Sequence, residues 1–190
     1  MKVIGVSGSA RTEGNTEIAV NIALEQLAKE GIETELIVLA GKRIEPCTAC
    51  MGCAKEPRCV IEDDFGPIYE KIRDAEGLIV GSPVYFGSAT PQTMALLDRV
   101  GYVARNNGNL LRHKVGGPIA IARRAGQNFT YAQMMFFYTI NEMILVGSSY
   151  WNIAFGRGKG EIRDDEEGVE TLETFGTNMA WVMKKLYGSV

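Results

Sequence analysis

The sequence lacks a long hydrophobic run near its N-terminus. The apolar stretch in MKVIGVSGSA spans about five residues before glycine and serine interrupt it. A signal peptide has an apolar core of roughly 7–15 residues, and a membrane-spanning helix needs about 20 apolar residues. We therefore expect a cytoplasmic protein. A framework of structural disulfides is unfavourable in that reducing compartment.

Basic blocks are also missing. The 190 residues include 20 lysines and arginines and 23 aspartates and glutamates, so the formal net charge is −3, and the two signs are interspersed. Without a basic stripe or a polybasic tail, we expect neither nucleic acid nor a membrane as a partner. Linkers, internal repeats and low-complexity tracts are absent too, so we interpret residues 1–190 as one domain.

Strand-like and helix-like segments alternate along the chain. The strand-like segments are continuous apolar runs, which suit a parallel sheet buried on both faces. Five such strands predict a doubly wound α/β sheet of flavodoxin-like or Rossmann type. The predicted strands lie within 2–8, 34–40, 77–87, 114–126 and 144–151, and the predicted helices are 16–31, 63–77, 90–106, 127–143 and 164–188.

The loop after the first predicted strand, SGSARTEGNT (7–16), lacks two phosphate-binding signatures. It has neither the G-K-[ST] of a P-loop nor the G-x-G-x-x-G of a dinucleotide site. It still leads into a helix N-terminus, which attracts phosphate. We predict a terminal phosphomonoester such as that of FMN, and a plain βα turn is the alternative. The candidate donors are Ser7, Ser9, Arg11, Asn15 and Thr16.

Two further loops are predicted at the same edge of the sheet. SPVYFGSATPQ (82–92) offers aromatic faces and a backbone that can approach a flat ligand. ARRAGQN (122–128) brings arginines that could stabilise a reduced flavin near its N1–C2 carbonyl region. The alternatives are core aromatics and solvated arginines. The candidate flavin-binding residues are Pro83, Val84, Tyr85, Phe86, Gly87, Arg123, Arg124 and Gly126.

Cysteine is absent outside residues 47–59, where CTACMGCAKEPRC holds Cys47, Cys50, Cys53 and Cys59. Zinc sites usually combine two separated C-x2-C pairs or include histidine, and the single histidine, His113, is far away in sequence. Three closely spaced thiols resemble the start of the bacterial ferredoxin motif. The spacing favours a 4Fe–4S cluster, with zinc and free or redox-paired thiols as alternatives.

With these segments in place, the chain resembles the NADPH-dependent FMN reductase superfamily. GSARTEGNT is similar to its phosphate loop, and GSPVYFGSATPQTMALLDR to its flavin loop and following helix. The spacing C-x2-C-x2-C-x5-C, followed by CVIEDDF, resembles the compact motif of the iron–sulfur flavoprotein branch. The resemblance implies a flavodoxin-like five-stranded parallel sheet in order 2-1-3-4-5 with helices on both faces.

The resemblance also implies a function. We expect an FMN-dependent oxidoreductase that passes electrons between a 4Fe–4S cluster and FMN, with ferredoxin or NAD(P)H as donor and a small oxidant as acceptor. The alternatives are a cluster-free NAD(P)H-dependent FMN or quinone reductase and a non-catalytic electron carrier or redox sensor. A flavin carries the redox chemistry itself, so no catalytic side chain is predicted. Asp63 and Asp64 are interpreted as helix caps.

One predicted helix lacks a polar face. The segment 131–143, YAQMMFFYTINEM, is apolar almost all round, so its outer side needs a cover. A neighbouring subunit is the favoured cover, and the C-terminal segment with Trp181 and Met183 is the alternative. Relatives with the resembling motif are oligomers in which the cluster approaches a neighbour's flavin, so we expect a homodimer or homotetramer.

Overall fold

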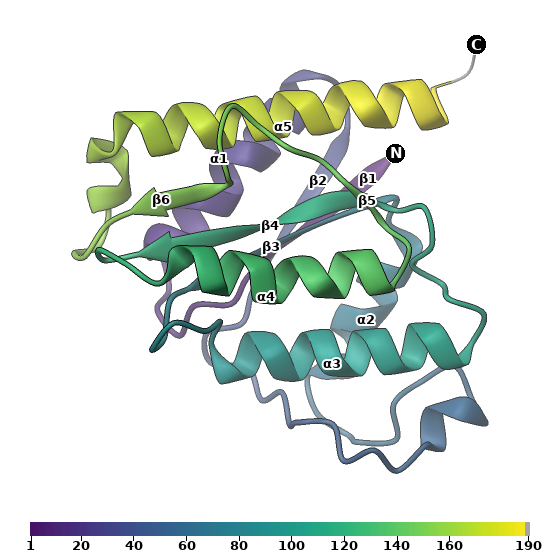
Figure 1. Ribbon diagram of the computed structural model, residues 1–190. Coiled ribbons are helices and arrows are strands. Elements are labelled where there is room, and N and C mark those ends of the chain that lie inside the picture. Colours follow the sequence, from purple (N-terminus) through teal and green to yellow (C-terminus); the bar gives the residue numbers. More distant parts are fainter. Residues whose placement is uncertain (189–190) are drawn as a thin grey trace.

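A parallel β-sheet forms the centre of the protein. The strands are β1 (Lys2–Ser7), β2 (Glu33–Val38), β3 (Gly77–Pro83), β4 (Val115–Ala122), β5 (Ile144–Leu145) and β6 (Ile153–Phe155). The computed structural model describes residues 1–188, and Figure 1 shows the sheet between two layers of helices. The sheet runs β2-β1-β3-β4-β5, with every neighbouring pair parallel, and β6 also pairs with β4. The predicted flavodoxin-like order 2-1-3-4-5 is confirmed.

The fifth strand position differs from the prediction of one strand over 144–151. Two short strands, β5 and β6, share the edge of β4, and residues 147–151 leave the sheet between them. The Ser148 hydroxyl donates to the Tyr150 carbonyl and to Asn152 Oδ1. These local bonds, next to Gly147, compete with a strand ladder. As a result, β6 rather than the predicted strand reaches the carboxyl edge of the sheet.

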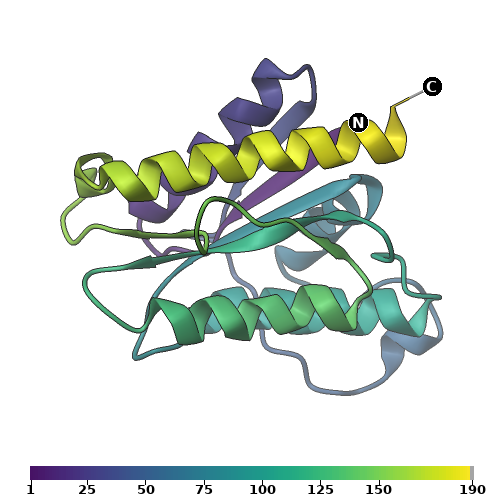
Figure 2. The same ribbon diagram turned by 45° about the horizontal axis from the view of Figure 1, so that its top comes forward.

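Helices cover both faces of the sheet (Figures 1 and 2). They are α1 (Asn15–Lys29), α2 (Phe65–Asp74), α3 (Pro91–Asn106), α4 (Gln127–Ile140) and α5 (Glu166–Tyr187), with the short 3-10 helices η1 (Gly52–Ala54) and η2 (Glu161–Asp164). One core lies under α2, α3 and α4, and the other lies under α1 and α5. In residues 1–188, no helix has both the length and the apolar character needed to cross a membrane. That residues 1–190 are one domain stays a prediction.

The C-terminal helix does not cover α4. In both views, α5 lies across the sheet from α4 (Figures 1 and 2), and Met183 is buried in the core shared with α1. Trp181 is 63% exposed. The alternative cover for α4 is therefore wrong. On the outer side of α4, Phe136 is 65% exposed and Ile140 is 60% exposed.

Candidate functional site

An arginine-lined cavity of about 300 Å³ lies at the carboxyl ends of β1, β3 and β4. Three guanidinium groups share its wall, and it has no carboxylate, so the cavity suits an anionic ligand. Eight of the predicted site residues line it. The lining residues are Ser9, Arg11, Asn15, Thr16, Pro83, Val84, Tyr85, Ile121, Arg123, Gly156 and Arg157.

The N-terminus of α1 opens into this cavity without a side-chain cap. Its N-cap residue is Gly14, which has no side chain to accept a hydrogen bond from the first N–H groups of the helix. The nearby Ser9 Oγ accepts instead from Arg11 N, at 3.0 Å. Ser7 Oγ is buried with no hydrogen-bond partner in the described chain. Free N–H groups and a partial positive charge at a helix start are what a phosphate group requires.

Asn15 contributes in a way that the sequence did not indicate. Its Nδ2 donates to the Gly158 carbonyl at 2.8 Å, and its Oδ1 accepts from Gly160 N at 2.8 Å. The side chain therefore holds the loop after β6 against the loop after β1. Lys159 and Glu13 form an exposed ion pair across the same two loops, at 2.5 Å.

Two glycines bring the predicted loops together. The Gly8 carbonyl accepts from Thr90 Oγ1 at 2.7 Å, and a Cβ on Gly8 would lie 1.8 Å from Thr93 Oγ1. Gly126 has a φ of 91°, and a Cβ there would lie 2.9 Å from Val84 Cγ1. Only glycine allows these approaches. The loops after β1, β3 and β4 therefore form one continuous wall.

The second loop contains a tight turn with backbone strain. Tyr85 N donates to the Ser88 carbonyl at 2.8 Å, and Ser88 N donates back to Tyr85 at 3.0 Å. Phe86 and Gly87 between them have φ of 53° and 82°, and the left-handed conformation is unfavourable for a bulky residue. The Phe86 side chain is fully exposed. Five predicted residues belong to these loops without lining the cavity: Ser7, Phe86, Gly87, Arg124 and Gly126.

Arg157 lines the cavity but is not among the residues predicted from the sequence. It follows β6 and lines the cavity beside Arg11 and Arg123. The signal was present, since NIAF followed by GRGKG reads as a strand that ends in a glycine-rich loop. Placing the fifth strand at 144–151 hid it, because residues 153–160 then appeared to lie beyond the sheet.

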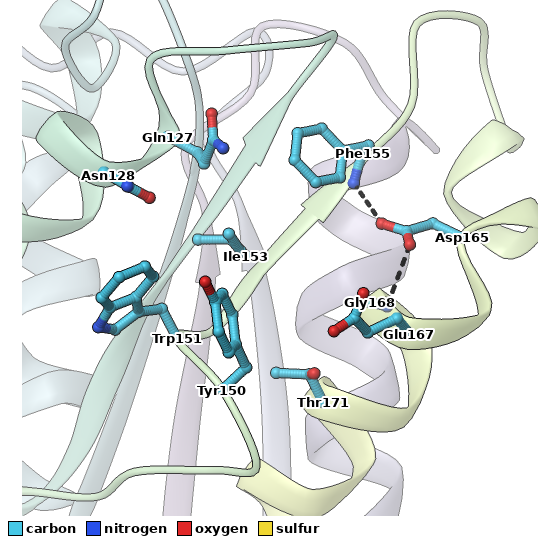
Figure 3. A pocket seen from close by; sticks show the side chains of 10 residues that line it. All are labelled: Gln127, Asn128, Tyr150, Trp151, Ile153, Phe155, Asp165, Glu167, Gly168 and Thr171. Carbon is cyan, nitrogen blue, oxygen red and sulfur yellow. Dashed lines mark hydrogen bonds between the residues drawn. The ribbon is translucent and has the colours of Figure 1, made fainter.

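A second cavity lies nearby, between the start of α4, residues 150–153 and the start of α5 (Figure 3). The rings of Tyr150 and Trp151 face it, with centroids 4.8 Å apart. Its charged lining residues are both acidic, and Asp165 already accepts from Phe155 N at 2.7 Å and Gly168 N at 3.1 Å. An acidic wall repels phosphate, so the arginine-lined cavity is the better phosphate site.

The four cysteines line one small cavity of about 20 Å³ between residues 47–61 and α3. Histidine and carboxylate side chains are absent from its lining, so the cysteine sulfurs are its principal metal-binding groups. The backbone N–H of Gly52 and the Thr48 hydroxyl lower the pKa of the exposed Cys50 thiol, which favours the metal-binding thiolate. Within residues 1–188, no three candidate ligands stand close enough to share a single metal ion.

A buried ion pair closes the base of the cysteine segment. The side chains of Arg99 and Asp63 are 1% and 0% exposed. Two bonds join them, from Nη1 to Oδ2 at 2.6 Å and from Nη2 to Oδ1 at 3.0 Å. Arg99 also donates to the carbonyls of Glu45 at 3.1 Å and Ile61 at 3.2 Å. These carbonyls lie two residues outside 47–59 on either side, so the pair fixes both ends of the segment.

The predicted role of the two aspartates changes accordingly. Asp64 is the N-cap residue of α2, but its side chain makes no capping bond. It accepts from Arg43 N instead, at 2.7 Å. Asp63 does accept from Phe65 N at 3.1 Å, although its main partner is Arg99. Tertiary contacts across the cysteine segment outweigh local capping here.

Comparison with known proteins identifies the family to which the chain belongs. The model of the NADPH-dependent FMN reductase family matches residues 1–158, which include all four cysteines. An iron–sulfur flavoprotein of Methanocaldococcus jannaschii is 43% identical over 191 residues, covering 97% of this chain and 98% of that protein. The chain belongs to the iron–sulfur flavoprotein branch of the FMN reductase family. Membership makes it an FMN-dependent redox protein.

Two solved structures show how widely this family fold is shared. A flavone reductase matches 100% of this chain and 65% of its own, with a TM-score of 0.75 and 20% identity. A WrbA-like flavodoxin from Agrobacterium tumefaciens matches 97% of both chains, with a TM-score of 0.67 and 14% identity. At such identities the likeness concerns the flavodoxin-like fold alone.

Proposed function

We propose that this iron–sulfur flavoprotein holds FMN in the arginine-lined cavity and a 4Fe–4S cluster on its four cysteines, and passes electrons to a small oxidant. The proposal rests on the presence of two cavities with different lining groups in one chain. One is lined by three guanidinium groups and the other by four thiols. Bound FMN supplies two-electron chemistry, and a cluster supplies one-electron transfer. Ferredoxin or NAD(P)H is the proposed donor.

The residues fit FMN at both of its ends. The uncapped start of α1 and the cavity-lining residues Ser9 and Arg11 suit the phosphate. Pro83, Val84 and Tyr85 give the opposite wall an apolar and aromatic character that suits a flat ring. We propose that Arg123 is the third-loop arginine nearest the ring, because Arg124 does not line the cavity.

The thiols fit a cluster better than a single ion. Four sulfur ligands and no nitrogen or oxygen ligand suit an iron–sulfur cluster or zinc. Three thiols in one C-x2-C-x2-C run resemble a ferredoxin motif, whereas zinc sites usually combine two separated C-x2-C pairs. The enclosed space is about that of one water. We therefore expect the part of the segment around the exposed Cys50 to move outward when a cluster binds, while Cys53 and Cys59 stay packed against the core.

Anaerobic purification followed by iron, sulfide and FMN analysis tests the proposal. We expect about four irons and four sulfides per FMN, with a broad brown absorbance beside the flavin bands. FMN without iron would point to the cluster-free reductase, and both cofactors without turnover of an oxidant would point to the carrier. Absence of both would contradict the proposal. Assays with reduced ferredoxin and with NAD(P)H identify the donor.

Arg11→Ala is expected to weaken FMN binding about tenfold or more while riboflavin binding changes little. Arg11 lines the cavity, and only FMN carries the phosphate that the guanidinium would meet; a charged hydrogen bond contributes about 1.5–3 kcal/mol. Fluorescence titration of both ligands measures the effect. Arg124→Ala is the matched control, because it removes a loop arginine that does not line the cavity. Equal weakening of both ligands by Arg11→Ala would contradict the phosphate assignment.

We further propose a homodimer or homotetramer, with a second copy covering the groove between α3 and α4. This groove encloses about 800 Å³, its wall includes the exposed Phe136 and Ile140, and Tyr102 lines both the groove and the cysteine cavity. Tyr102 is eleven residues along α3 from Pro91, about 17 Å at 1.5 Å per residue. The flavin loops and the cysteines of one chain are thus far apart, and a neighbour's flavin can be closer.

Phe136→Glu is expected to dissociate the oligomer and slow the reduction of flavin by ferredoxin, with both cofactors retained. A carboxylate in the groove would have to be desolvated on association. Light scattering measures the mass, and stopped-flow absorbance measures flavin reduction. Trp181→Glu changes an equally exposed aromatic residue on the opposite face and should alter neither. A monomeric unmodified protein, or an unchanged reduction rate in dissociated subunits, would contradict this assembly.

A further inference from the structure

One face of α3 supports the cysteine segment. Arg99, Tyr102 and Val103 line the cysteine cavity, and Asn106 contacts one of the thiols. Their spacing of three, four and seven residues places all four side chains along one side of the helix. Arg99 and Asn106 are two helical turns apart and both are N–H donors, so a single rigid element presents donors to two parts of the segment.

Asn106 and its neighbour Asn107 hold the same cysteine by different atoms. Asn106 Nδ2 donates to Cys53 Sγ at 3.3 Å. Asn107 Nδ2 donates to the Cys53 carbonyl at 2.9 Å and to the Val103 carbonyl at 2.8 Å. One amide therefore acts on the sulfur that would bind iron, while the other acts only on the backbone.

One N–H group of Arg99, at Nε, has no hydrogen-bond partner in the described residues. Its Nη1 and Nη2 groups bond Asp63 and two carbonyls, whereas Nε is buried without a partner in residues 1–188. The side chain, 1% exposed, lies on the wall of the cysteine cavity, beside the thiol of Cys59. An unsatisfied buried donor is costly. The Cys59 sulfur, which lines the same cavity, is a candidate acceptor for this N–H group.

We propose that Arg99 and Asn106 set the reduction potential of the cluster by donating N–H groups to the ligand sulfurs of Cys59 and Cys53. This inference rests on the proposed function. When one electron is added from a donor, no bond forms or breaks, but the sulfurs become more negative. N–H groups aimed at them stabilise the reduced form and raise the potential. Both residues are positioning residues that act through the cysteines.

Asn106→Leu and Asn107→Leu form a matched pair that tests the inference. Both variants and the unmodified protein are titrated anaerobically with dithionite, and the reduced cluster is followed by electron paramagnetic resonance. At the midpoint reduction potential of the unmodified protein, the ratio of reduced to oxidised cluster should be about tenfold lower in Asn106→Leu. This corresponds to a midpoint potential that is lower by about 59 mV. Asn107→Leu should lower the unfolding temperature and leave the midpoint unchanged.

Arg99→Lys provides an independent arm. Lysine keeps a positive charge opposite Asp63 but has no Nε–H, so the midpoint should fall in the same direction. If this variant does not fold, the asparagine pair decides alone. An unchanged midpoint in Asn106→Leu with iron intact would overturn the inference, as would loss of iron from that variant. An unmodified protein without iron would instead overturn the proposed function and, with it, this inference.

Discussion

Cys50→Ala is expected to reduce the iron content from about four atoms per chain to nearly none, while FMN stays bound. Cys50 lines the cysteine cavity and is its most exposed thiol, and a 4Fe–4S cluster held by four cysteines needs every thiolate. The loops proposed to bind FMN lie at the carboxyl ends of β1, β3 and β4, in a different part of the chain. Colorimetric iron analysis and the flavin absorbance of the same sample measure both cofactors.

Lys55→Ala is the control for Cys50→Ala. Lys55 is an exposed residue of the same segment that does not line the cavity, so its replacement should preserve iron and FMN alike. A full iron complement in Cys50→Ala would show that the ligand set is wrong. Loss of FMN together with iron would contradict the independence of the two sites.

Asp63→Asn is expected to destabilise the protein by about 3–5 kcal/mol, because it leaves the buried guanidinium of Arg99 without its counter-charge. For a chain of this size, each kcal/mol lowers the unfolding temperature by about 2–4 °C. Urea unfolding followed by circular dichroism gives the free energy. Asp64→Asn removes an exposed carboxylate one residue away and should cost much less. Equal decreases in unfolding free energy in both variants would contradict the stabilising role of the ion pair.

The same ion pair predicts sensitivity to acid. Burial alone would raise the pKa of Asp63, but hydrogen bonds from Arg99 and from the backbone N–H groups of Glu45 and Phe65 outweigh it and lower the pKa. A carboxyl group whose pKa is lower in the folded than in the unfolded protein stabilises the fold. This stabilisation is complete at pH values above the pKa of the group in the unfolded chain, which is about 4. That stability is lost as the pH falls through the folded-state pKa. The difference in unfolding free energy between the unmodified protein and Asp63→Asn should therefore become smaller at acidic pH.

Local sequence patterns predicted a doubly wound parallel sheet and three of the walls of the arginine-lined cavity, whereas the strand order came from the family resemblance. The buried strands are uninterrupted apolar runs, and the loops at their carboxyl ends carry the polar residues, so both could be identified without knowledge of contacts. The fourth wall, around Arg157, depended on where the fifth strand ends. That end is set by side-chain hydrogen bonds of Ser148, which compete with strand pairing in a way that hydrophobicity does not show.

The buried ion pair between Arg99 and Asp63 could not be predicted from local sequence patterns. The two residues are 36 positions apart, and each has an ordinary local explanation, one as a charged residue on a helix and the other as a cap. Their partnership depends on α3 packing against the base of the cysteine segment. The contact of Asn106 with Cys53 has the same origin. These are tertiary relationships that a single sequence does not encode in its spacing.

The division between β5 and β6 also affects how the protein can associate with other chains. Two residues of β5 and three of β6 form this border of the sheet, and residues 147–151 interrupt it. An incoming strand would find no continuous row of free N–H and carbonyl groups, so amyloid-like growth from this border is disfavoured. The opposite border, β2, is longer but carries Glu33 and Glu35. Concentrated solutions of the folded protein are therefore expected to resist ordered aggregation through added strands.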